Sequence, residues 1–395
     1  MDMEELDALL KEHEVFRQNS LNLVASENVM SETARRFLSS DLVHRYIDEE
    51  FYGGTRYAEK IVEIAKNSLA KLFSCEYVFV DPLSGNMAHM AALMAFTRSG
   101  DKVAVIDFKY GGYPFRYNDF ERHPIYIAFD EDEFNIDAEK TKEILLSEKP
   151  KLVFLGASII LFPQPVKEIS EVAHDIGAVV AYDASHVLGL IAGKKFQDPL
   201  REGADLVVAS THKTFGGPQG GIVFTNDHDV ARRIKYVLDR PPLLVDNPHV
   251  HRIGALAVTA LEMLRYGKEY AEQIVRNSKE LGAQLHKWEI EVRYGEKGYT
   301  ETHQLYYPQQ PEIGRKIRDK LEEAHIITDT IIRFGTQEVT RRGMKGPEMR
   351  KIAEAIYLAL SNRIDEAKNI VRNLTSKFRK IHYSFDINKK HKYDT

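Results

Sequence analysis

The chain has 395 residues, of which 43% are hydrophobic and 29% charged, and its net charge is −5. This length predicts two or three domains with a large core, and the charge gives no indication of a nucleic-acid partner. The single cysteine, Cys75, excludes an intramolecular disulfide and indicates a reducing compartment. We find no signal peptide and no apolar run long enough to span a membrane. We therefore expect a cytoplasmic protein without a membrane partner, and we predict no metal site.

The first 45 residues are predicted to form a helical arm. Short β-rich apolar runs then alternate with helical patterns, which predicts an α/β domain with a mostly parallel seven-stranded sheet and helices on both faces. The expected strands are 77–80, 102–106, 124–129, 151–156, 178–183, 205–210 and 221–224, and the expected helices are 85–98, 136–148 and 165–176. Residues 193–200 are expected to form a loop that enters a short helix.

Longer helical patterns dominate the rest of the chain. They cover residues 249–264, 269–288, 346–361 and 364–378, with a few short strands between them. We interpret this part as a smaller α+β domain. The predicted division is an N-terminal arm at 1–45, a large domain at 46–262 and a small domain at 263–395.

One lysine lies between two of the predicted buried strands, in "VVASTHKTFGGPQGGIVF" (207–224). A lysine at a strand end is usually a solvated surface group. Burial, however, lowers the pKa of a lysine, and a neutral amine can form a Schiff base with a carbonyl. The glycines after Lys213 would allow the backbone to approach a flat ligand closely.

An aspartate ends the preceding predicted strand, in "AVVAYDASHVLGL" (178–190). Asp183 can simply cap the next turn, but it precedes Lys213 by one strand-helix-strand unit, so both can meet at the carboxyl edge of the sheet. A lysine that forms a Schiff base, together with an acid that faces a ring nitrogen, is the pattern for pyridoxal phosphate.

The segment "DPLSGNMAHMAALMAF" (81–96) offers a site for the phosphate of such a cofactor. Ser84, Gly85 and Asn86 stand where a strand ends and an apolar helix begins, and a helix N-terminus favours an anion. Ser84 as an ordinary N-cap is an equally good interpretation of this segment alone.

An arginine interrupts an apolar run in "IIRFGTQEVTRRGM" (331–344). A buried arginine needs a partner, so Arg333 either grips a substrate carboxylate through two bonds or forms a structural ion pair. We interpret Arg341 and Arg342 as surface charge.

These stretches, in this order, resemble the serine hydroxymethyltransferase family, and the archaeal members most. The similarity covers nearly the whole chain. It includes "LNLVASEN" (21–28), "HRY" (44–46), "YGG" (52–54), "SGN" (84–86), "YDASHVLGLIAGKKFQDPLREGAD" (182–205), "STHKTFGGPQGG" (210–221), "FGTQEVTRRGM" (334–344) and "IHYSFD" (381–386).

The resemblance implies a pyridoxal-phosphate enzyme of the aspartate-aminotransferase fold type, which acts as a homodimer with sites at the subunit interface. Lys213 would bind the cofactor covalently, Asp183 would face its pyridine nitrogen, and His212 would line the site. The other implied cofactor residues are Tyr46, Ser84, Gly85, Asn86, Ser158, His186 and Ser210. Ser26 and Arg333 would bind the amino-acid carboxylate, and Tyr52 would reach in from the neighbouring subunit.

Three departures from the family pattern bear on the reaction. Tyr113, in "YGGYP", stands where the family stacks a histidine on the cofactor ring, and an aromatic ring can still stack there. The loop after Tyr46 is shortened, so the acid/base group is either Asp48 or Glu49. The segment before Arg333 is also abridged, where the family has a loop that helps to bind the pterin. Phe108 and Tyr110 lie where the family contacts that pterin.

We therefore predict interconversion of serine and glycine, with transfer of a one-carbon unit to a reduced pterin. The alternative is a pterin-independent aldolase for 3-hydroxy amino acids such as threonine. A desulfurase is disfavoured, because Cys75 lies far in sequence from any mobile catalytic loop. A non-catalytic interaction protein is disfavoured by the intact set of Lys213, Asp183 and Arg333.

Overall fold

The structure is a computed structural model, and it describes residues 3–48, 50–238 and 243–385. Contacts divide these residues into two groups. We call residues 30–269 and 383–385 the sheet unit, and residues 3–29 and 270–382 the small unit. Each unit has its own core, and each is described by itself.

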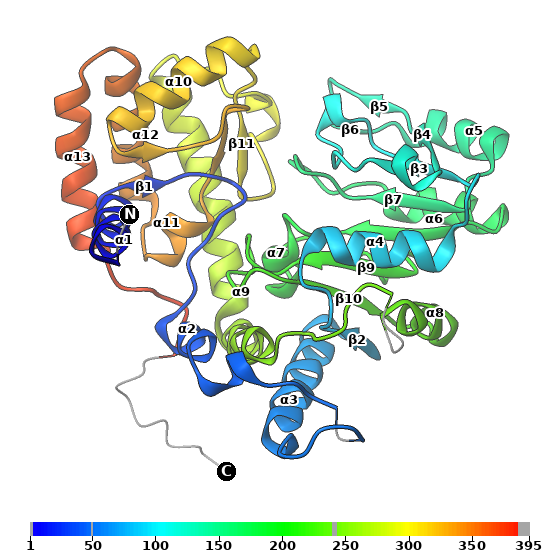
Figure 1. Cartoon of the computed structure of the whole chain (residues 1–395). Coiled ribbons are helices and arrows are strands. Elements are labelled where there is room, and N and C mark those ends of the chain that lie inside the picture. Colours follow the sequence, from blue (N-terminus) through cyan, green and yellow to red (C-terminus); the bar gives the residue numbers. More distant parts are fainter. Residues whose placement is uncertain (1–2, 49, 239–242, 386–395) are drawn as a thin grey trace. The chain divides into compact units, whose positions relative to one another are not determined.

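A seven-stranded sheet forms the centre of the sheet unit (Figure 1). Its strands are β2 (Tyr77–Phe79), β3 (Lys102–Val105), β4 (His123–Tyr126), β7 (Leu152–Leu155), β8 (Val179–Asp183), β9 (Leu206–Ser210) and β10 (Gly221–Thr225). Their spatial order is β2-β10-β9-β8-β7-β3-β4, and β10 alone runs antiparallel to its neighbours. The predicted mostly parallel seven-stranded sheet is confirmed.

Helices cover both faces of this sheet. On one face, α4 (Gly85–Phe96) and α8 (His228–Leu238) share a core with alternate strand residues such as Val208 and Val223. The neighbouring residue Phe224 points to the other face, where Phe73 of α3 (Arg56–Phe73) stacks on it at 4.5 Å. The remaining elements of the sheet unit are α2 (Glu32–Leu38), η1 (Asp41–His44), η2 (Phe108–Tyr110), η3 (Tyr117–Phe120), β5 (Phe129–Asp130), β6 (Asn135–Ile136), α5 (Ala138–Glu148), α6 (Val166–Asp175) and α7 (Leu188–Ala192).

The small unit contains two short strand pairs packed against helices. β1 (Leu21–Asn22) pairs in parallel with β12 (Ile326–Ile327), and β11 (Gln304–Tyr306) pairs antiparallel with β13 (Arg333–Gly335). Its core joins residues from all of these parts, among them Leu21, Leu305 and Phe334. Its helices are α1 (Met3–Gln18), α10 (Pro311–Glu323), α11 (Gln337–Arg341), α12 (Gly346–Leu360) and α13 (Ile364–Lys377), with η4 (Gly295–Lys297) between strands.

Some predicted elements differ from the observed ones. The first 45 residues contain α1, α2 and η1, but β1 interrupts them, so they are not a purely helical arm. The short helix expected at the end of residues 193–200 is wrong, because turns follow α7 there.

The two helices predicted at 249–264 and 269–288 are a single helix, α9 (Val250–Lys287). A glycine inside a helix costs only about 1 kcal/mol, and Met263 and Tyr270, on either side of Gly267, are buried. Their burial offsets the glycine. The contact groups also differ from the predicted boundaries, because residues 3–29 join the small unit and the sheet unit extends along α9 to Glu269.

Among the described residues, no helix is both long enough and apolar enough to span a membrane.

Candidate active site

The carboxyl edge of the sheet brings together most of the predicted cofactor residues. Asp183 is the last residue of β8, and Lys213 follows the end of β9 by three positions. Ser84 precedes α4, which packs against β9 and β10. Because β10 lies between β2 and β9, the turns that carry Ser84 and Lys213 meet at this edge.

Short hydrogen bonds link Lys213 to Asp183 through two serines. Lys213 Nζ donates to Ser210 Oγ at 3.0 Å, and the Ser210 amide donates to Ser185 Oγ at 2.9 Å. The Ser185 amide in turn donates to Asp183 Oδ1 at 2.9 Å. Main-chain amides therefore hold the side chains of Asp183 and Ser185 in place.

The Asp183 carboxyl is under opposing influences. Its burial raises its pKa, whereas the positive charge of Lys213 and the hydrogen bonds from Ser185 lower it. A largely buried carboxylate of this kind, 14% exposed, requires a nearby cation or donor. A protonated pyridine nitrogen would meet that requirement.

The N-terminus of α4 fits a phosphate group. Ser84 Oγ accepts from the Met87 amide at 3.1 Å, and the Ser84 carbonyl accepts from the Ala88 amide at 3.0 Å. The first N–H groups of a helix have no acceptor within it, so those of Gly85 and Asn86 are oriented for an anion.

Close packing requires the glycine at the start of α4. A Cβ on Gly85 would lie 2.9 Å from Ser210 Cβ, and a Cβ on Gly221 would lie 2.2 Å from the Ser84 carbonyl oxygen. The lysine turn and the phosphate turn thus approach each other backbone to backbone. A side chain in either place would force the two turns apart. With an amine, a carboxylate and free helix N–H groups held at one edge, the residues fit a phosphorylated pyridine cofactor.

Tyr113 joins the same edge from the loop after η2. Its hydroxyl donates to Asn86 Oδ1 at 2.9 Å. Burial, followed by the negative charge of Asp183, raises the pKa of Tyr113, so it remains a neutral phenol. Its ring is therefore available for stacking beside the phosphate turn.

Three further predicted residues lie along this edge. The Ser158 amide donates to the Gly111 carbonyl at 2.7 Å, which ties Ser158 to the loop that carries Tyr113. His186 is buried, and its carbonyl accepts from Thr214 Oγ1 at 2.7 Å. His212, next to Lys213, is half-buried.

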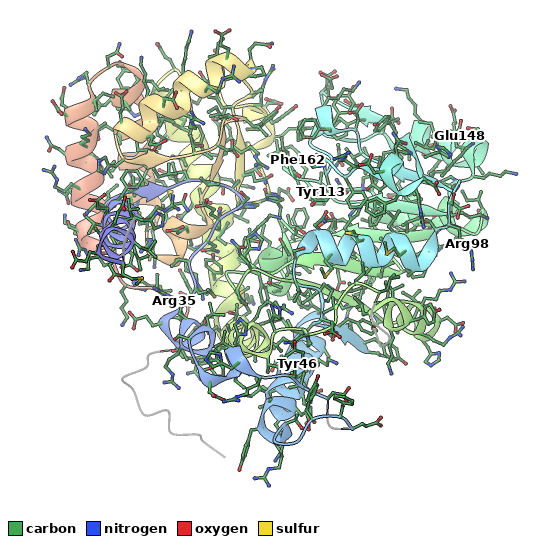
Figure 2. All side chains as sticks on the ribbon, in the orientation of Figure 1. Arg35, Tyr46, Arg98, Tyr113, Glu148 and Phe162 are labelled. Carbon is green, nitrogen blue, oxygen red and sulfur yellow. The ribbon has the colours of Figure 1, made fainter. Side chains whose placement is uncertain are left out.

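A second group of predicted residues lies apart from this edge. Figure 2 shows Tyr46 well separated from Tyr113. The rings of Tyr46 and Tyr52 are 5.3 Å apart, and Asp48 Oδ1 accepts from the Glu50 amide at 3.2 Å. These residues form a turn of their own within the chain. Glu49 lies outside the described residues.

The predicted carboxylate-binding residues belong to the small unit, where the structure brings them close together. An isolated bridge pairs Val24 with Phe334, so the turn that contains Ser26 lies next to Arg333. Gln337 Nε2 donates to the carbonyls of Val24 and Glu27, at 2.8 and 2.6 Å, and so fixes that turn. The sequence analysis missed Gln337, although its place four residues after Arg333 is a usable signal.

The sequence allows Arg333 either to bind a substrate carboxylate or to form a structural ion pair, and the structure shows an ion pair with Asp329. Its Nε and one terminal nitrogen both lie 2.9 Å from Asp329 Oδ2, and the side chain is almost fully buried. The adjacent Ile332 has φ 58°, a left-handed conformation that a β-branched residue rarely adopts. This backbone turn aligns Asp329 with Arg333.

The interpretation of Arg341 as surface charge is wrong. Arg341 is fully buried, with its guanidinium 5.5 Å from the centre of the Tyr270 ring. A planar guanidinium can stack on an aromatic face in this way. Arg342 is half-buried and donates to Glu338.

The only thiol of the chain is poorly suited to chemistry. Cys75 is buried, and burial raises its pKa to about 12. A nucleophilic cysteine needs a lowered pKa and access, so the structure supports the argument against a desulfurase. In the described part of the chain, no three His, Cys, Asp or Glu side chains are grouped to hold a metal ion.

Comparison with known proteins gives consistent matches. The family model for serine hydroxymethyltransferase matches residues 1–303. Curated serine hydroxymethyltransferases from Archaeoglobus fulgidus and Methanobrevibacter smithii are 39% and 38% identical, each over 98% of this chain and over 94% and 97% of their own lengths. The relative from Thermococcus kodakarensis is 38% identical over 95% of this chain and 94% of its own length.

A solved structure shares the fold. The crystal structure of L-threonine transaldolase from Pseudomonas fluorescens, in its internal aldimine state, aligns with a TM-score of 0.90 and 25% identity over 97% of this chain and 93% of that one. The predicted fold type and the predicted resemblance to archaeal members are thus confirmed. The chain belongs to the serine hydroxymethyltransferase family and is a pyridoxal-phosphate-dependent enzyme.

Proposed function

We propose that this protein interconverts serine and glycine and transfers a one-carbon unit to a reduced pterin. The observation that carries the proposal is the hydrogen-bonded series from Lys213 through Ser210 and Ser185 to Asp183, next to the phosphate turn at Ser84. This series joins an amine to a buried carboxylate at the edge of the sheet. We place the reaction in the cytoplasm, in keeping with the single buried cysteine.

The residues of the sheet edge have separate tasks. The Lys213 amine holds the cofactor covalently, the Gly85 and Asn86 amides bind its phosphate, and Tyr113 stacks on its ring. Asp183 faces the ring nitrogen and keeps a proton there. Pyridoxal phosphate supplies the sink for the electron pair left on Cα when the Cα–Cβ bond of serine breaks.

Arg333 and Ser26 bind the amino-acid carboxylate in this proposal. A guanidinium carries five N–H donors in a planar fork. Asp329 accepts from Nε and one terminal nitrogen of Arg333 and so fixes the plane of the guanidinium. Asp329 thereby orients the arginine, and Arg333 fixes the orientation of the bond to be broken.

A second subunit supplies the remaining groups. Tyr46 and its neighbours Phe51 and Tyr57 are exposed by 46%, 75% and 67%, and Met3, Leu6, Leu9, Leu10 and Val15 of α1 are also exposed. Exposed apolar clusters of this size indicate an interface. We therefore propose a homodimer in which Tyr52, with Asp48 or Glu49 as the acid/base group, completes the site of the partner subunit.

Mixing two inactive variants tests the shared site. Lys213→Ala and Tyr52→Ala homodimers should each lose activity. After subunit exchange, half of the dimers are mixed and carry one intact site, so about a quarter of wild-type activity should return. Differently tagged subunits will show that exchange has occurred. If activity then does not recover, Tyr52 either acts in the same chain's site as Lys213 or takes no part in the site.

A pterin-independent aldolase is the second candidate, and the short segment before Arg333 favours it. Only residues 328–332 separate β12 from β13, which leaves little chain for a wall against a pterin. The structural neighbour is itself named a threonine transaldolase. Aldol cleavage needs only the cofactor, the carboxylate grip and a base.

The deciding assay offers the purified enzyme serine, threonine and allo-threonine, each with and without tetrahydrofolate or a modified archaeal pterin. We expect serine cleavage that depends weakly on the pterin, together with pterin-free cleavage of threonine or allo-threonine. Cleavage of none of these amino acids would refute the proposed function. Tight pterin binding, with strictly pterin-dependent serine cleavage and no threonine cleavage, would refute the aldolase alternative.

A further inference from the structure

A buried histidine of α4 lies behind the Asp183 carboxylate. His89 is 2% exposed, and its Nδ1 lies 4.0 Å from Asp183 Oδ2. This distance is too long for a hydrogen bond, and Nδ1 is one of the buried side-chain nitrogens without a hydrogen-bond partner among the described residues. A buried unpaired nitrogen is costly, so its position near Asp183 calls for an explanation.

The other ring nitrogen of His89 is fixed. Its Nε2 lies 2.7 Å from the Tyr117 hydroxyl, and Phe154 stacks on the imidazole with ring centres 3.7 Å apart. Tyr113 and Phe115 flank the same ring at 5.4 and 4.9 Å. These aromatic side chains hold the imidazole in one orientation.

Protonation states follow from the surroundings. Burial lowers the pKa of His89 to about 3, so the imidazole is neutral and carries one N–H. Burial, followed by the charge of Asp183, raises the pKa of Tyr117 well above its usual value, so its O–H is retained. The Tyr117 hydroxyl can therefore donate to Nε2.

This donation selects the tautomer. If Nε2 accepts from Tyr117, the single N–H of His89 is on Nδ1 and is directed at Asp183. The opposite tautomer would present a lone pair to a carboxylate at 4.0 Å, which is repulsive in a site of low dielectric constant. Both considerations favour the Nδ1–H form.

We propose that His89, oriented by Tyr117, is a positioning residue that directs an N–H dipole at Asp183 and keeps Asp183 ionised and in place. This inference rests on the proposed role of Asp183 opposite the ring nitrogen of the cofactor. Ser185 thus donates to Asp183 Oδ1, while His89, held by Tyr117, lies near Oδ2 of the same carboxylate. His89, a polar residue in a mostly apolar helix, was not among the predicted site residues, because the signal for an anion site lies only in the N-terminal residues of α4.

Two substitutions of His89 separate the N–H from the bulk of the ring. Asparagine places an amide N–H near the position of Nδ1, whereas leucine fills similar space without a donor. We expect His89→Leu to lower kcat by about ten- to a hundredfold, the range typical of residues that orient a catalytic group, with little change in the KM for serine. It should also weaken pyridoxal phosphate binding to the apoprotein. His89→Asn should recover most of both losses.

A spectroscopic measurement is independent of turnover. In 15N-histidine-labelled protein, with and without cofactor, nitrogen chemical shifts identify the tautomer of His89, and the His89→Asn variant assigns its signals. We expect the Nδ1–H form, and we expect Tyr117→Phe, which removes one oxygen atom, to weaken that preference. Because Tyr117→Phe is a small change, it keeps the test valid if His89→Leu does not fold.

Three results would overturn the inference: an Nε2–H tautomer in the wild type, a His89→Leu variant with wild-type kcat, or equal losses in the asparagine and leucine variants at equal melting temperature. Asp183→Asn serves as the reference variant. If Asp183→Asn is impaired while His89→Leu is not, only the inference about His89 fails. If Asp183→Asn is itself active, the proposed role of Asp183 fails.

Discussion

The edge of the sheet and the turn at residues 46–52 are built in different ways. At the sheet edge, hydrogen bonds of about 3 Å link Lys213, Ser210 and Asp183, and glycines allow backbone contact. In the turn, Asp48 accepts from the amides of Glu50, Phe51 and Tyr52, and the rings of Tyr46 and Phe51 are exposed. The sheet edge is preorganised within one chain. The exposed turn is consistent with the proposal that it completes the active site of a partner subunit.

This difference indicates how the enzyme divides its work. A covalently held cofactor requires groups fixed to within a fraction of an ångström, and strands and helix ends provide that precision. In the proposed homodimer, groups that act on the side chain of the substrate would come from the partner subunit, and the subunit interface would position them. Substitutions at the sheet edge should therefore damage each chain by itself, whereas substitutions in the turn should be complemented in mixed dimers.

The largest effect is expected from Lys213→Ala. Loss of the amine removes both the covalent bond to the cofactor and a proton-transfer group, so kcat should fall by at least about a thousandfold. Steady-state assays with serine will measure this. A variant that keeps a tenth of wild-type activity would show that Lys213 is not the essential amine. The sheet edge would then not be the cofactor site that is contrasted here with the turn.

Asp183→Asn should have the next largest effect. A neutral amide cannot hold a proton on the ring nitrogen, so kcat should fall by about a hundred- to a thousandfold while the cofactor remains bound. Absorbance of the bound cofactor and single-turnover rates separate the two properties. Near wild-type rates would mean that Asp183 faces something other than the ring.

Arg333→Lys tests whether Arg333, in the small unit, binds the substrate carboxylate. Lysine cannot reproduce a planar two-bond grip. The loss of one charge-assisted pair, about 2–3 kcal/mol, corresponds to a rise of about 30- to 160-fold in the KM for serine. Asp329→Asn is the matched control, because it removes the ion pair but retains the guanidinium. If both variants lose stability and neither changes KM, Arg333 is a structural residue.

Gly85→Ala should have the smallest effect of the four. The added Cβ would lie 2.9 Å from Ser210 Cβ, so the two turns must separate by a few tenths of an ångström. Overpacking of this kind costs about 1–3 kcal/mol, and we expect about tenfold weaker cofactor binding. Gly346→Ala is a matched control at the first residue of α12, where the new Cβ meets only Glu280 Cγ at 3.8 Å. Equal cofactor affinities in both variants would argue against close packing as the reason for Gly85.

Much of the sheet unit could be predicted from the sequence, because its signals are local. Buried parallel strands are continuous apolar runs, and all seven were predicted to within a few residues. Lys213, Asp183 and Ser84 follow strand ends, so the topology alone brings them to one edge. The continuous helix α9 was missed because Gly267 looks like a break, whereas burial on both sides keeps the helix intact.

The other errors concern partners that are distant in sequence or hidden by burial. Arginine is usually a surface residue, and the contact of Arg341 with the Tyr270 ring forms only when the chain has folded. His89 meets Asp183 across ninety-four positions of chain, and that pairing depends on how α4 packs over the sheet. Tyr52 was predicted to reach the site of a neighbouring subunit, and Tyr46 and Asp48 lie near it and away from the sheet edge, so the fold of one chain does not determine their roles.

The central claim is that Lys213 holds pyridoxal phosphate at the edge of the sheet. Borohydride reduction of the purified holoenzyme, followed by digestion and peptide mapping, tests it most directly. We predict a single labelled peptide that contains residues 210–221, with the phosphopyridoxyl group on Lys213 and no label in the Lys213→Ala variant. Label on any other lysine, or no label in an enzyme that retains activity, would contradict the account.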